Sequence, residues 1–576
     1  MKKLLIYLKA YRKEACLAPI FKMLEAVFEL FVPLVIKGII DYGIAAEDRA
    51  YCLRMGLLLL LLAVIGLAMA TTAQWFSARA AAGFAAKIKQ VLMEHIQKLS
   101  YTELDTIGTS TLITRMTSDV NQVQTGTNLV LRLFMRSPFI VFGSMIMAFT
   151  IDFKAAMIFV ITIPLLSVVV FGIMLSSIPL YKKVQSQLDR VLGITRENLT
   201  GVRVIRAFNK EEEEISHFTR LQTFVGKISA LMNPLTFVIV NSAILVLVWT
   251  GAWRVEGGIL TQGAVVALVN YMSQILVELI KLADLIINIT KAVACGNRIQ
   301  KVLEVEPSME NGSKECIEEK RTPANAVDFN HVSLTYSGAG APSLTDIDLH
   351  VKTGQTIGII GGTGSGKTSV VNLIPRFYDA TQGNVLVFGK PVKEQDMESL
   401  RSQIAVVPQK AVLFAGTIRE NMKWGKEDAT DEEIMEALTI AQAAEVVQKK
   451  EGGLDAFVEQ GGKNLSGGQR QRLTIARALV RKPRILILDD SASALDFATD
   501  AALRKAIREM KNAPTVFIVS QRTSSIRFAD QILVLDDGKS VGVGTHDELL
   551  TTCSVYKEIY DSQYKKTDSK KSGKEA

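Results

Sequence analysis

The sequence contains few cysteines, and none of them has a metal-binding spacing. The five cysteines are scattered along 576 residues without a C-x-x-C pair: Cys16, Cys52, Cys295, Cys316 and Cys553. Zinc sites and disulfide frameworks require cysteines at short, regular spacings, so this pattern indicates neither. We also expect no cleavable leader, because the apolar run in MKKLLIYLK is short and no small-residue cleavage site follows it. An amphipathic helix on a membrane surface is the better interpretation of these residues.

The apolar residues are unevenly distributed. Hydrophobic residues make up 48% of the chain and the mean hydropathy is +0.23, which is high for a soluble protein. They concentrate in residues 15–290, whereas residues 326–560 have the composition of an ordinary soluble domain. The net charge of +8 could suggest nucleic acid. The positive residues lie where membrane topology requires them, so we expect no nucleic-acid partner.

Six apolar blocks precede the soluble half. Each is long enough to cross about 30 Å of hydrocarbon as a helix, and they lie at about 15–40, 53–76, 129–150, 155–180, 231–253 and 263–290. Buried helices of a soluble protein would carry a polar stripe, which the run LLLLLL at 57–62 lacks. The long connection at 181–230 carries nine Lys and Arg residues, whereas the short loop at 41–53 carries only Arg49. This asymmetry predicts cytoplasmic termini in a multi-pass protein of a bacterial plasma membrane.

Some ionisable residues fall inside the predicted spans. Lys22, Glu25 and Glu29 share one face of the first span, and Glu278, Lys281 and Asp284 lie near the inner end of the sixth. Charges at this depth are costly and usually face a cavity or a partner. Internal ion pairs, Lys22–Glu25 or Glu278–Lys281, are one explanation. Contact with substrate is the other, with Glu25 and Glu29 as the candidates.

The stretch GGTGSGKT at 361–368 carries the clearest chemistry. It fits G-x-x-x-x-G-K-[ST], in which backbone N–H groups surround phosphates and the following helix directs its N-terminus at them. Lys367 would reach the β- and γ-phosphates, and the Thr368 hydroxyl would bind Mg²⁺. The apolar run 355–360 before the loop predicts a strand, and residues 369–374 after it predict a helix. This context favours a nucleotide site over a chance match.

Other features follow the loop in the soluble half. Residues 484–489 predict a buried parallel strand ending in Asp489, which suits Mg²⁺, and Asp490 follows where a general base would lie. Gln409 follows a strand at 404–408, and Tyr336 could stack on adenine or pack as a strand residue. LSGGQ at 465–469 opens a helix and offers a second anion site at a helix N-terminus.

The two motifs together resemble the ATP-binding cassette (ABC) transporters, whose signature sequence is LSGGQ. The resemblance covers nearly the whole chain and is of the exporter type, with the membrane domain fused ahead of the cassette. Residues 109–119 and 197–208 resemble the family's first and second coupling-helix regions. The resemblance implies two cassettes packed head to tail, with each ATP between the phosphate loop of one chain and the LSGGQ of the other. It also implies that Gln409 binds Mg²⁺ or the attacking water, and that Asp496 links the two sites.

Two positions depart from the family pattern. The family has Glu as hydrolytic base where this chain has Asp490, and a switch histidine where it has Gln521. Aspartate is shorter than glutamate by about 1.5 Å, and a general base must lie within about 2.6–3.2 Å of its proton. Glutamine cannot exchange a proton as histidine does. Harmless drift at both positions is the alternative explanation.

The sequence thus predicts a fold and a set of site residues. We expect a membrane domain of six transmembrane helices at 1–304, a linker at 305–325, an α/β P-loop nucleotide-binding domain at 326–564 and a basic polar tail at 565–576. The expected catalytic residues are Asp490, Gln521 and Ser466. The expected nucleotide-binding residues are Tyr336, Gly361, Gly362, Thr363, Gly364, Ser365, Gly366, Lys367, Thr368, Ser369, Gln409, Leu465, Ser466, Gly467, Gly468 and Gln469. Thr368, Gln409 and Asp489 are the expected Mg²⁺ ligands, with ATP and Mg²⁺ as cofactors.

The predicted function is ATP-driven export of a hydrophobic or amphipathic substrate, such as a drug, lipid or peptide. The paired departures resemble the degenerate-site subunit of bacterial heterodimeric multidrug exporters. The expected partners are therefore a second ABC half-transporter, membrane lipids and the small amphipathic substrate. A homodimer with slow hydrolysis and a nucleotide-gated regulator or channel remain alternatives, whereas the six spans exclude a soluble DNA-repair ATPase.

Overall fold

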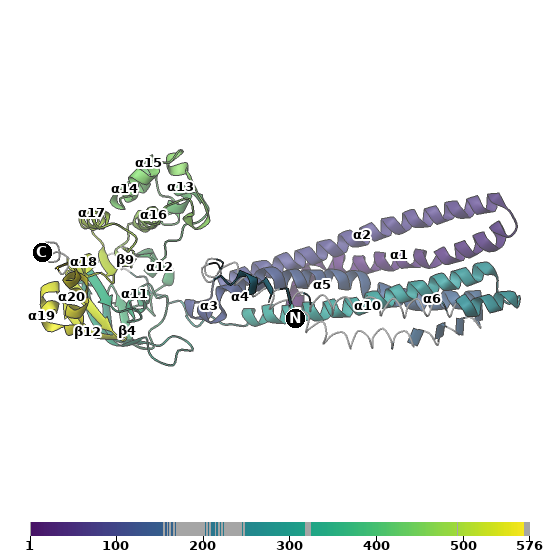
Figure 1. The fold of residues 1–576 in the computed structure, drawn as a ribbon, viewed down its shortest axis with the longest axis horizontal. Coiled ribbons are helices and arrows are strands. Elements are labelled where there is room, and N and C mark those ends of the chain that lie inside the picture. The colour runs from purple at the N-terminus through teal and green to yellow at the C-terminus, as the bar shows by residue number, and fades with distance from the viewer. Residues whose placement is uncertain are drawn as a thin grey trace. The chain divides into compact units, whose positions relative to one another are not determined.

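The protein divides into two compact units. The computed structural model describes residues 2–153, 248–316, 324–491 and 493–568, with scattered residues between 156 and 245. The first unit comprises Met1–Gln97 and Thr109–Val305, and the second comprises Lys98–Gly108 and Glu306–Ala576. The first is helical and the second contains the large sheet (Figure 1).

The helical unit consists of long helices joined by short segments. Its described elements are η1 (Lys2–Tyr11), α1 (Arg12–Gly38), η2 (Ile39–Ile44), α2 (Arg49–Ile96), α4 (Thr109–Thr114), η3 (Arg115–Asp119), α5 (Val120–Leu133), α6 (Arg136–Ile151) and α10 (Gln262–Leu303). Helices α1 and α2 pack as a hairpin, and α10 packs on α5 and α6 (Figure 1). The 48 residues of α2 rise about 72 Å at 1.5 Å per residue, so the helix is far longer than a bilayer is thick.

Three described helices are long and apolar enough to cross a membrane. They are Arg49–Ile96, Thr109–Ile151 and Gln262–Leu303. The leucines of the 57–62 run are largely exposed, with 58% of Leu57 accessible, as expected of a surface that faces lipid. The first predicted span, 15–40, corresponds to α1, which is not one of these three helices. Two other predicted spans, 155–180 and 231–253, lie mostly outside the described residues. The count of six spans therefore stays a prediction.

The second unit is built on a ten-stranded mixed sheet. The strand order is β5-β4-β1-β2-β12-β11-β3-β10-β9-β6. The strands are β1 (Asn325–Leu334), β2 (Leu344–Lys352), β3 (Thr356–Gly361), β4 (Gln382–Val387), β5 (Lys390–Pro391), β6 (Ile404–Val407), β9 (Ile485–Asp489), β10 (Thr515–Val519), β11 (Gln531–Asp536) and β12 (Lys539–Gly544). A separate pair comprises β7 (Gly416–Thr417) and β8 (Phe457–Val458).

Helices complete this unit. They are α3 (Tyr101–Ile107), α11 (Lys367–Leu373), α12 (Met397–Ser402), α13 (Ile418–Lys423), α14 (Asp431–Ile440), α15 (Ala444–Gln448), α16 (Gly467–Val480), α17 (Phe497–Arg508), α18 (Thr523–Ile526), α19 (His546–Thr552) and α20 (Ser554–Asp568). Strands β3, β9 and β10 are buried along their whole length, which explains their continuous apolar sequences. The fold predicted for this half, an α/β domain with a P-loop, is confirmed.

The parallel strands β3, β10 and β9 end side by side. Val519 at the end of β10 pairs with Ile359 of β3 on one side and with Asp489 of β9 on the other. The segments that leave these strands carry the phosphate loop, Gln521 and Asp490. Ligands of open α/β sheets bind at the carboxyl ends of the strands, so the topology gathers the predicted site residues where such sites lie.

Part of the predicted linker is fixed to the cassette. Lys314 forms a bridge with Gln395 and an ion pair with Glu394, and Asn311 donates a hydrogen bond to Asp396. These residues therefore lie along the segment before α12. Residues 317–323 fall outside the description, and the boundaries 305–325 stay a prediction.

The first long connection contributes helix α3 to the cassette unit, and the coupling role of residues 109–119 stays a prediction. The predicted coupling region 109–119 forms α4 and η3 of the helical unit. The helix that packs with the cassette is α3, just before it. It begins in a capping box in which Ser100 and Glu103 satisfy each other's backbone N–H groups. The second predicted coupling region, 197–208, lies largely outside the described residues.

Candidate nucleotide-binding site

The loop between β3 and α11 has the geometry of a phosphate cradle. Gly364 and Gly366 have φ values of +84° and +94°, which glycine adopts without strain. A Cβ on Gly361 would lie 2.1 Å from the Leu535 carbonyl oxygen, so the backbone approach excludes any side chain there. The prediction of strand, loop and helix is confirmed.

Lys367 lies at the centre of this loop. Its Nζ donates to the carbonyl oxygens of Gly361 and Gly362 at 2.9 and 2.5 Å, and the residue is buried. Burial lowers the pKa of Lys367, although the nearby carboxylates of Asp490 and Asp489 oppose this shift. A buried ammonium inside a ring of backbone groups is suited to bind phosphate oxygens.

The oxygen ligands expected for Mg²⁺ lie together beside the loop. The Thr368 hydroxyl donates to Asp489, with its oxygen 3.2 and 3.1 Å from the two carboxylate oxygens. Asp489 is buried at the end of β9, and burial raises the pKa of its carboxyl group. Among the described residues no three His, Cys, Asp or Glu side chains gather as a metal site. Mg²⁺ at a nucleotide usually takes only one or two protein ligands beside phosphates and water, so Thr368 and Asp489 fit it.

Gln409 and Asp490 meet at the edge of this site. Gln409 Nε2 lies 3.4 Å from Asp490 Oδ2, a long contact. Asp490 has a φ of +45°, and its N–H donates to the Val519 carbonyl at 3.0 Å. Burial raises the pKa of Asp490. The backbone strain and the partly buried carboxyl group are both common at functional sites.

The LSGGQ segment forms the predicted helix N-terminus. Ser466 is the N-cap of α16, where its Oγ accepts from Gln469 N at 3.2 Å and Gln469 Oε1 accepts from Ser466 N at 2.9 Å. Ser466 and Gly467 are exposed. Among the described residues no hydrogen bond or ion pair joins this segment to the phosphate loop of the same chain.

Tyr336 contacts the helix of the phosphate loop. Its hydroxyl donates to Ser369 Oγ at 2.9 Å, and its ring packs edge-on against Tyr378 at 4.9 Å. The residue is half-buried just after β1. This placement is compatible with both interpretations of Tyr336, and its stacking on adenine stays a prediction.

Two aromatic residues connect the nucleotide site to α3, and sequence reasoning missed them. Tyr378 donates its hydroxyl to Asp105 Oδ2 at 2.6 Å, and Phe377 packs against Tyr101 with ring centroids 4.7 Å apart. Tyr378 also packs on Tyr336, so one side chain contacts both α3 and the predicted adenine-stacking residue. Aromatic residues after a helix usually form part of a core, so no motif marks this pair.

Gln521 lies in the turn between β10 and α18. The Gln521 carbonyl oxygen accepts a hydrogen bond from Gln563 Nε2 at 2.8 Å, and Gln521 is exposed. Gln563 belongs to α20 and was not predicted to take part in the site. A lone glutamine on an exposed helix gives no sequence signal of such a role.

Four of the ionisable residues predicted in the spans are paired with one another. Lys22 Nζ lies 2.5 Å from Glu25 Oε2, and Lys281 Nζ lies 2.8 Å from Glu278 Oε1. Both ion pairs that the sequence suggested are thus present. Charged groups at this depth are usually paired.

Arg136 is a further member of this cluster that the sequence did not indicate. Its guanidinium contacts Glu29 at 2.6 Å and Glu278 at 2.5 Å, so a buried residue of α6 connects α1 to α10. The side chain of Glu29 is 40% exposed. A substrate role for Glu25 and Glu29 stays a prediction.

Comparison with known proteins agrees with this architecture. The family model described as ABC transporter transmembrane region matches residues 15–279, and the model described as ABC transporter matches residues 344–493. The chain is 37% identical to the uncharacterized ABC transporter ATP-binding protein YfiB of Bacillus subtilis over 98% of this chain and 99% of the relative. It is 30% identical to the ATP-dependent lipid A-core flippase of Hahella chejuensis over 86% of this chain and 85% of that relative.

A solved structure has the same fold. The structure of a bacterial Atm1-family ABC exporter with ATP bound aligns with a TM-score of 0.76 at 22% identity, covering 96% of this chain and all of that one. A membrane region fused ahead of an ATP-binding cassette is the half-transporter arrangement of exporters. The chain belongs to the ABC transporter family, and it is a multi-pass membrane protein of the exporter type. Its cassette is an ATPase domain that binds ATP to drive transport.

We expect Lys367→Ala to weaken ATP binding about ten- to hundred-fold, because it removes a charged hydrogen-bond donor from the phosphates. Tyr336→Ala should weaken it by only about two- to ten-fold, since it removes ring packing and a neutral hydrogen bond to Ser369 but no charge. Calorimetric titration of the purified full chain with ATP measures both. Lys352→Ala, an exposed lysine at the end of β2, is the control. Equal affinity in wild type and Lys367→Ala would refute the assignment of the loop.

The affinity for MgATP should also depend on pH at both ends of the range. Binding requires charged Asp489 and charged Lys367, whose pKa values burial raises and lowers, respectively. Affinity should therefore fall as the pH drops through the raised pKa of Asp489, and as it rises through the lowered pKa of Lys367. Titrations from about pH 4 to about pH 10 span both ordinary ranges. In Asp489→Asn, part of the fall in affinity at low pH should disappear. The protonation of ATP itself affects both proteins alike. An identical fall in wild type and Asp489→Asn would contradict the role of Asp489.

Proposed function

We propose that this chain is one subunit of a heterodimeric exporter that moves a hydrophobic or amphipathic substrate outward across a bacterial plasma membrane, with both termini in the cytoplasm. Its own ATP site is degenerate, and its LSGGQ segment completes the hydrolytic site of the partner. The observation that carries the proposal is the presence of two departures, Asp490 and Gln521, on adjacent strand ends of one nucleotide site.

The geometry around Asp490 supports a weak hydrolytic site. Its carboxylate lies 3.4 Å from Gln409 Nε2, and its backbone is held by the Val519 carbonyl. Because the backbone is fixed, the shorter side chain cannot recover the reach of about 1.5 Å that a glutamate would provide. A general base outside about 2.6–3.2 Å of its proton loses efficiency. Gln521, at the switch position, cannot titrate.

The geometry around Ser466 supports a contribution to the partner's site. Ser466 and Gly467 are exposed at the N-terminus of a 14-residue helix, where backbone N–H groups favour an anion. In the head-to-tail arrangement expected of the family, this surface meets the ATP on the other cassette. The chain's own ATP is held by residues 361–369 and Tyr336, with Mg²⁺ bound by Thr368, Asp489 and Gln409.

The relatives and the membrane half support an amphipathic substrate. One relative is named a lipid A-core flippase, and its substrate is a lipid. The described membrane helices are mainly apolar, and ion pairs of Lys22, Arg136 and Glu278 join charges within α1 and between α1, α6 and α10. An amphipathic molecule, with membrane lipids as neighbours, suits such a lining. Uphill transport into inside-out vesicles distinguishes a pump from a nucleotide-gated channel.

The division of labour predicts unequal effects of two mutations in the assembled complex. Asp490→Asn should change ATP turnover by less than about three-fold, because most hydrolysis occurs at the other site. Ser466→Ala should lower turnover about a hundred-fold, because it removes a donor that stabilises the transferring phosphoryl group. ATPase rates and melting temperatures of each variant measure this. Ser554→Ala, an exposed serine at the start of α20, is the control.

Opposite results would overturn the assignment. If Asp490→Asn abolishes turnover while Ser466→Ala is tolerated, the roles of the two sites are reversed. If the purified chain hydrolyses ATP rapidly without a partner, it acts as a homodimer.

Coupling should depend on Tyr378. Tyr378→Phe keeps the ring packing on Tyr336 but removes the hydrogen bond to Asp105, so ATP affinity should change by less than about two-fold. The amide protection that MgATP induces in residues 98–108 should fall several-fold, as measured by hydrogen exchange of the full chain. Tyr42→Phe, at a residue that is 66% exposed, is the control. Unchanged ATP-induced protection in Tyr378→Phe would show that α3 does not sense the nucleotide through this contact. The expected role of residues 203–208 in coupling concerns a segment outside the described residues.

A further inference from the structure

The turn that carries Gln521 has little internal support. It connects β10 to α18, which has only four residues. Within the turn, Ser520 N donates to the Ile359 carbonyl at 3.0 Å, and Arg522 N donates to Ser520 Oγ at 2.9 Å. A single helical turn is not stable by itself, because its few hydrogen bonds do not offset the entropy lost in ordering it. Other elements must therefore hold α18 and the turn before it.

One side chain of the C-terminal helix holds the N-terminal end of α18. Gln563 Oε1 accepts from Thr523 N at 3.0 Å and from Thr523 Oγ1 at 2.9 Å, and Gln563 Nε2 donates to the Gln521 carbonyl at 2.8 Å. Thr523 is fully buried. The single amide of Gln563 thus satisfies the backbone on both sides of Arg522.

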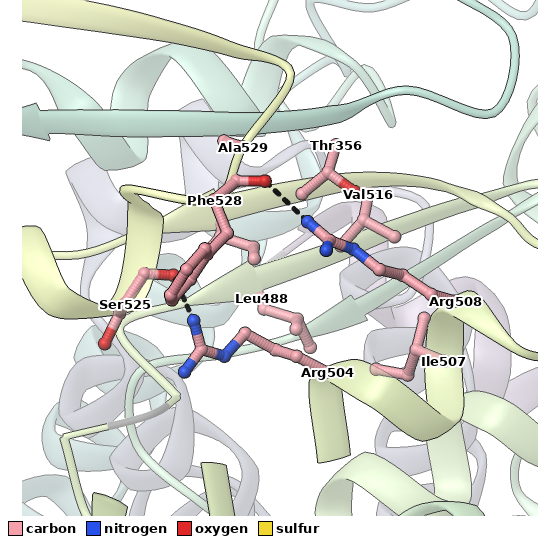
Figure 2. A pocket seen from close by; sticks show the side chains of 10 residues that line it. Thr356, Leu488, Arg504, Ile507, Arg508, Val516, Ser525, Phe528 and Ala529 are labelled. Atoms are coloured by element: carbon pink, nitrogen blue, oxygen red, sulfur yellow. Dashed lines mark hydrogen bonds between the residues drawn. The ribbon is translucent and has the colours of Figure 1, made fainter. Parts of the chain in front are cut away.

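A second contact holds the other end of α18. Arg504 of α17 donates to the carbonyl oxygens of Ser525 and Ser524 at 3.1 and 3.4 Å, and Arg508 donates to the Phe528 carbonyl at 2.5 Å. Figure 2 shows both guanidinium groups reaching from α17 toward this segment across a shallow pocket. The end of α18 is therefore anchored independently of α20.

Helix α20 has its own attachment to the cassette. Tyr556 is fully buried in the core, and its hydroxyl pairs with His546 Nδ1 at 2.7 Å. Val555 and Ile559 pack against the same core. Loss of the Gln563 amide should therefore leave α20 docked and α18 anchored by Arg504. Its effect should be confined to the turn at residues 520–523.

We propose that Gln563 is a positioning residue that sets the backbone of the switch position, so that Gln521 is directed at the bound nucleotide. Without it, the Thr523 N–H and hydroxyl lose their acceptor and the Gln521 carbonyl loses its donor. Buried donors left without partners are costly, so the turn would rearrange. The proposal rests on the proposed function in one respect, the placement of Gln521 at the γ-phosphate of retained ATP. It makes the C-terminal helix part of the machinery that retains the nucleotide.

The experiment uses the assembled full-length transporter loaded with radiolabelled MgATP, and measures the release of label after free nucleotide is removed. Gln563→Ala should raise the release rate about three- to ten-fold. Gln563→Glu keeps the acceptor for Thr523 but lacks the donor to the Gln521 carbonyl, so its rate should lie between those of wild type and Gln563→Ala. Ser562→Ala is the matched control, because this exposed neighbour bonds only to Ile559 of its own helix. Hydrogen exchange of residues 515–528 and 554–568 is measured on the same samples.

A positioning role predicts faster exchange in residues 520–524 of Gln563→Ala, with unchanged exchange across α20. Equal release rates in wild type and Gln563→Ala would overturn the proposal. Faster exchange throughout 554–568 in Gln563→Glu and Gln563→Ala would also overturn it, because the role would then be structural. Failure of the degenerate-site assignment is distinguishable, since wild type and Ser562→Ala would then release all of their label as rapidly formed ADP, with no slowly released fraction of intact ATP.

Discussion

The parallel pairing of β3, β10 and β9 is the constraint on which the nucleotide site depends. Val519 and Asp489, the last residues of β10 and β9, are paired, and Val519 also pairs with Ile359 two residues before the end of β3, so the three strands end close together at the carboxyl side of the sheet. The phosphate loop, the switch turn and Asp490 leave from that side. A backbone bond from Asp490 N to Val519 O continues the pairing one residue beyond β9, which fixes the residue at the base position relative to the switch turn. A register shift of one residue would direct these side chains to the opposite face.

Much of the cassette could be predicted because its signals are local. Strands buried on both faces give continuous apolar runs, as in residues 355–360 and 484–489, and the phosphate loop requires glycines at fixed spacing. The cap at Ser466 also follows from a short pattern, serine with glutamine three residues later. Each feature depends on residues a few positions apart, so it can be predicted from a short stretch of sequence.

The missed residues depend on contacts between distant segments. The hydrogen bond between Asp105 and Tyr378 spans 273 residues, and that between Gln563 and Thr523 spans 40. Neither has a periodicity or a spacing that a pattern could reveal. The contact of α3 with the cassette was missed for the same reason. The packing of Tyr101 on Phe377 depends on side-chain complementarity, which one sequence does not display. The role of residues 109–119 as a coupling region stays a prediction.

The charges of the membrane half also show that local patterns predict contacts within a helix but not contacts between distant helices. Local spacing was sufficient to suggest Lys22–Glu25 and Glu278–Lys281, because residues three apart on a helix are neighbours. It could not indicate that Arg136 of α6 would contact both Glu29 and Glu278. Removing one partner of a buried ion pair leaves an uncompensated charge, at a cost of about 3–5 kcal/mol. The Arg136 contacts therefore hold α1, α6 and α10 in one arrangement. Arg136 contacts only one of the two Glu29 carboxylate oxygens, and the Glu29 side chain is 40% exposed, so a cationic substrate that met the other oxygen would leave the Arg136 contact in place.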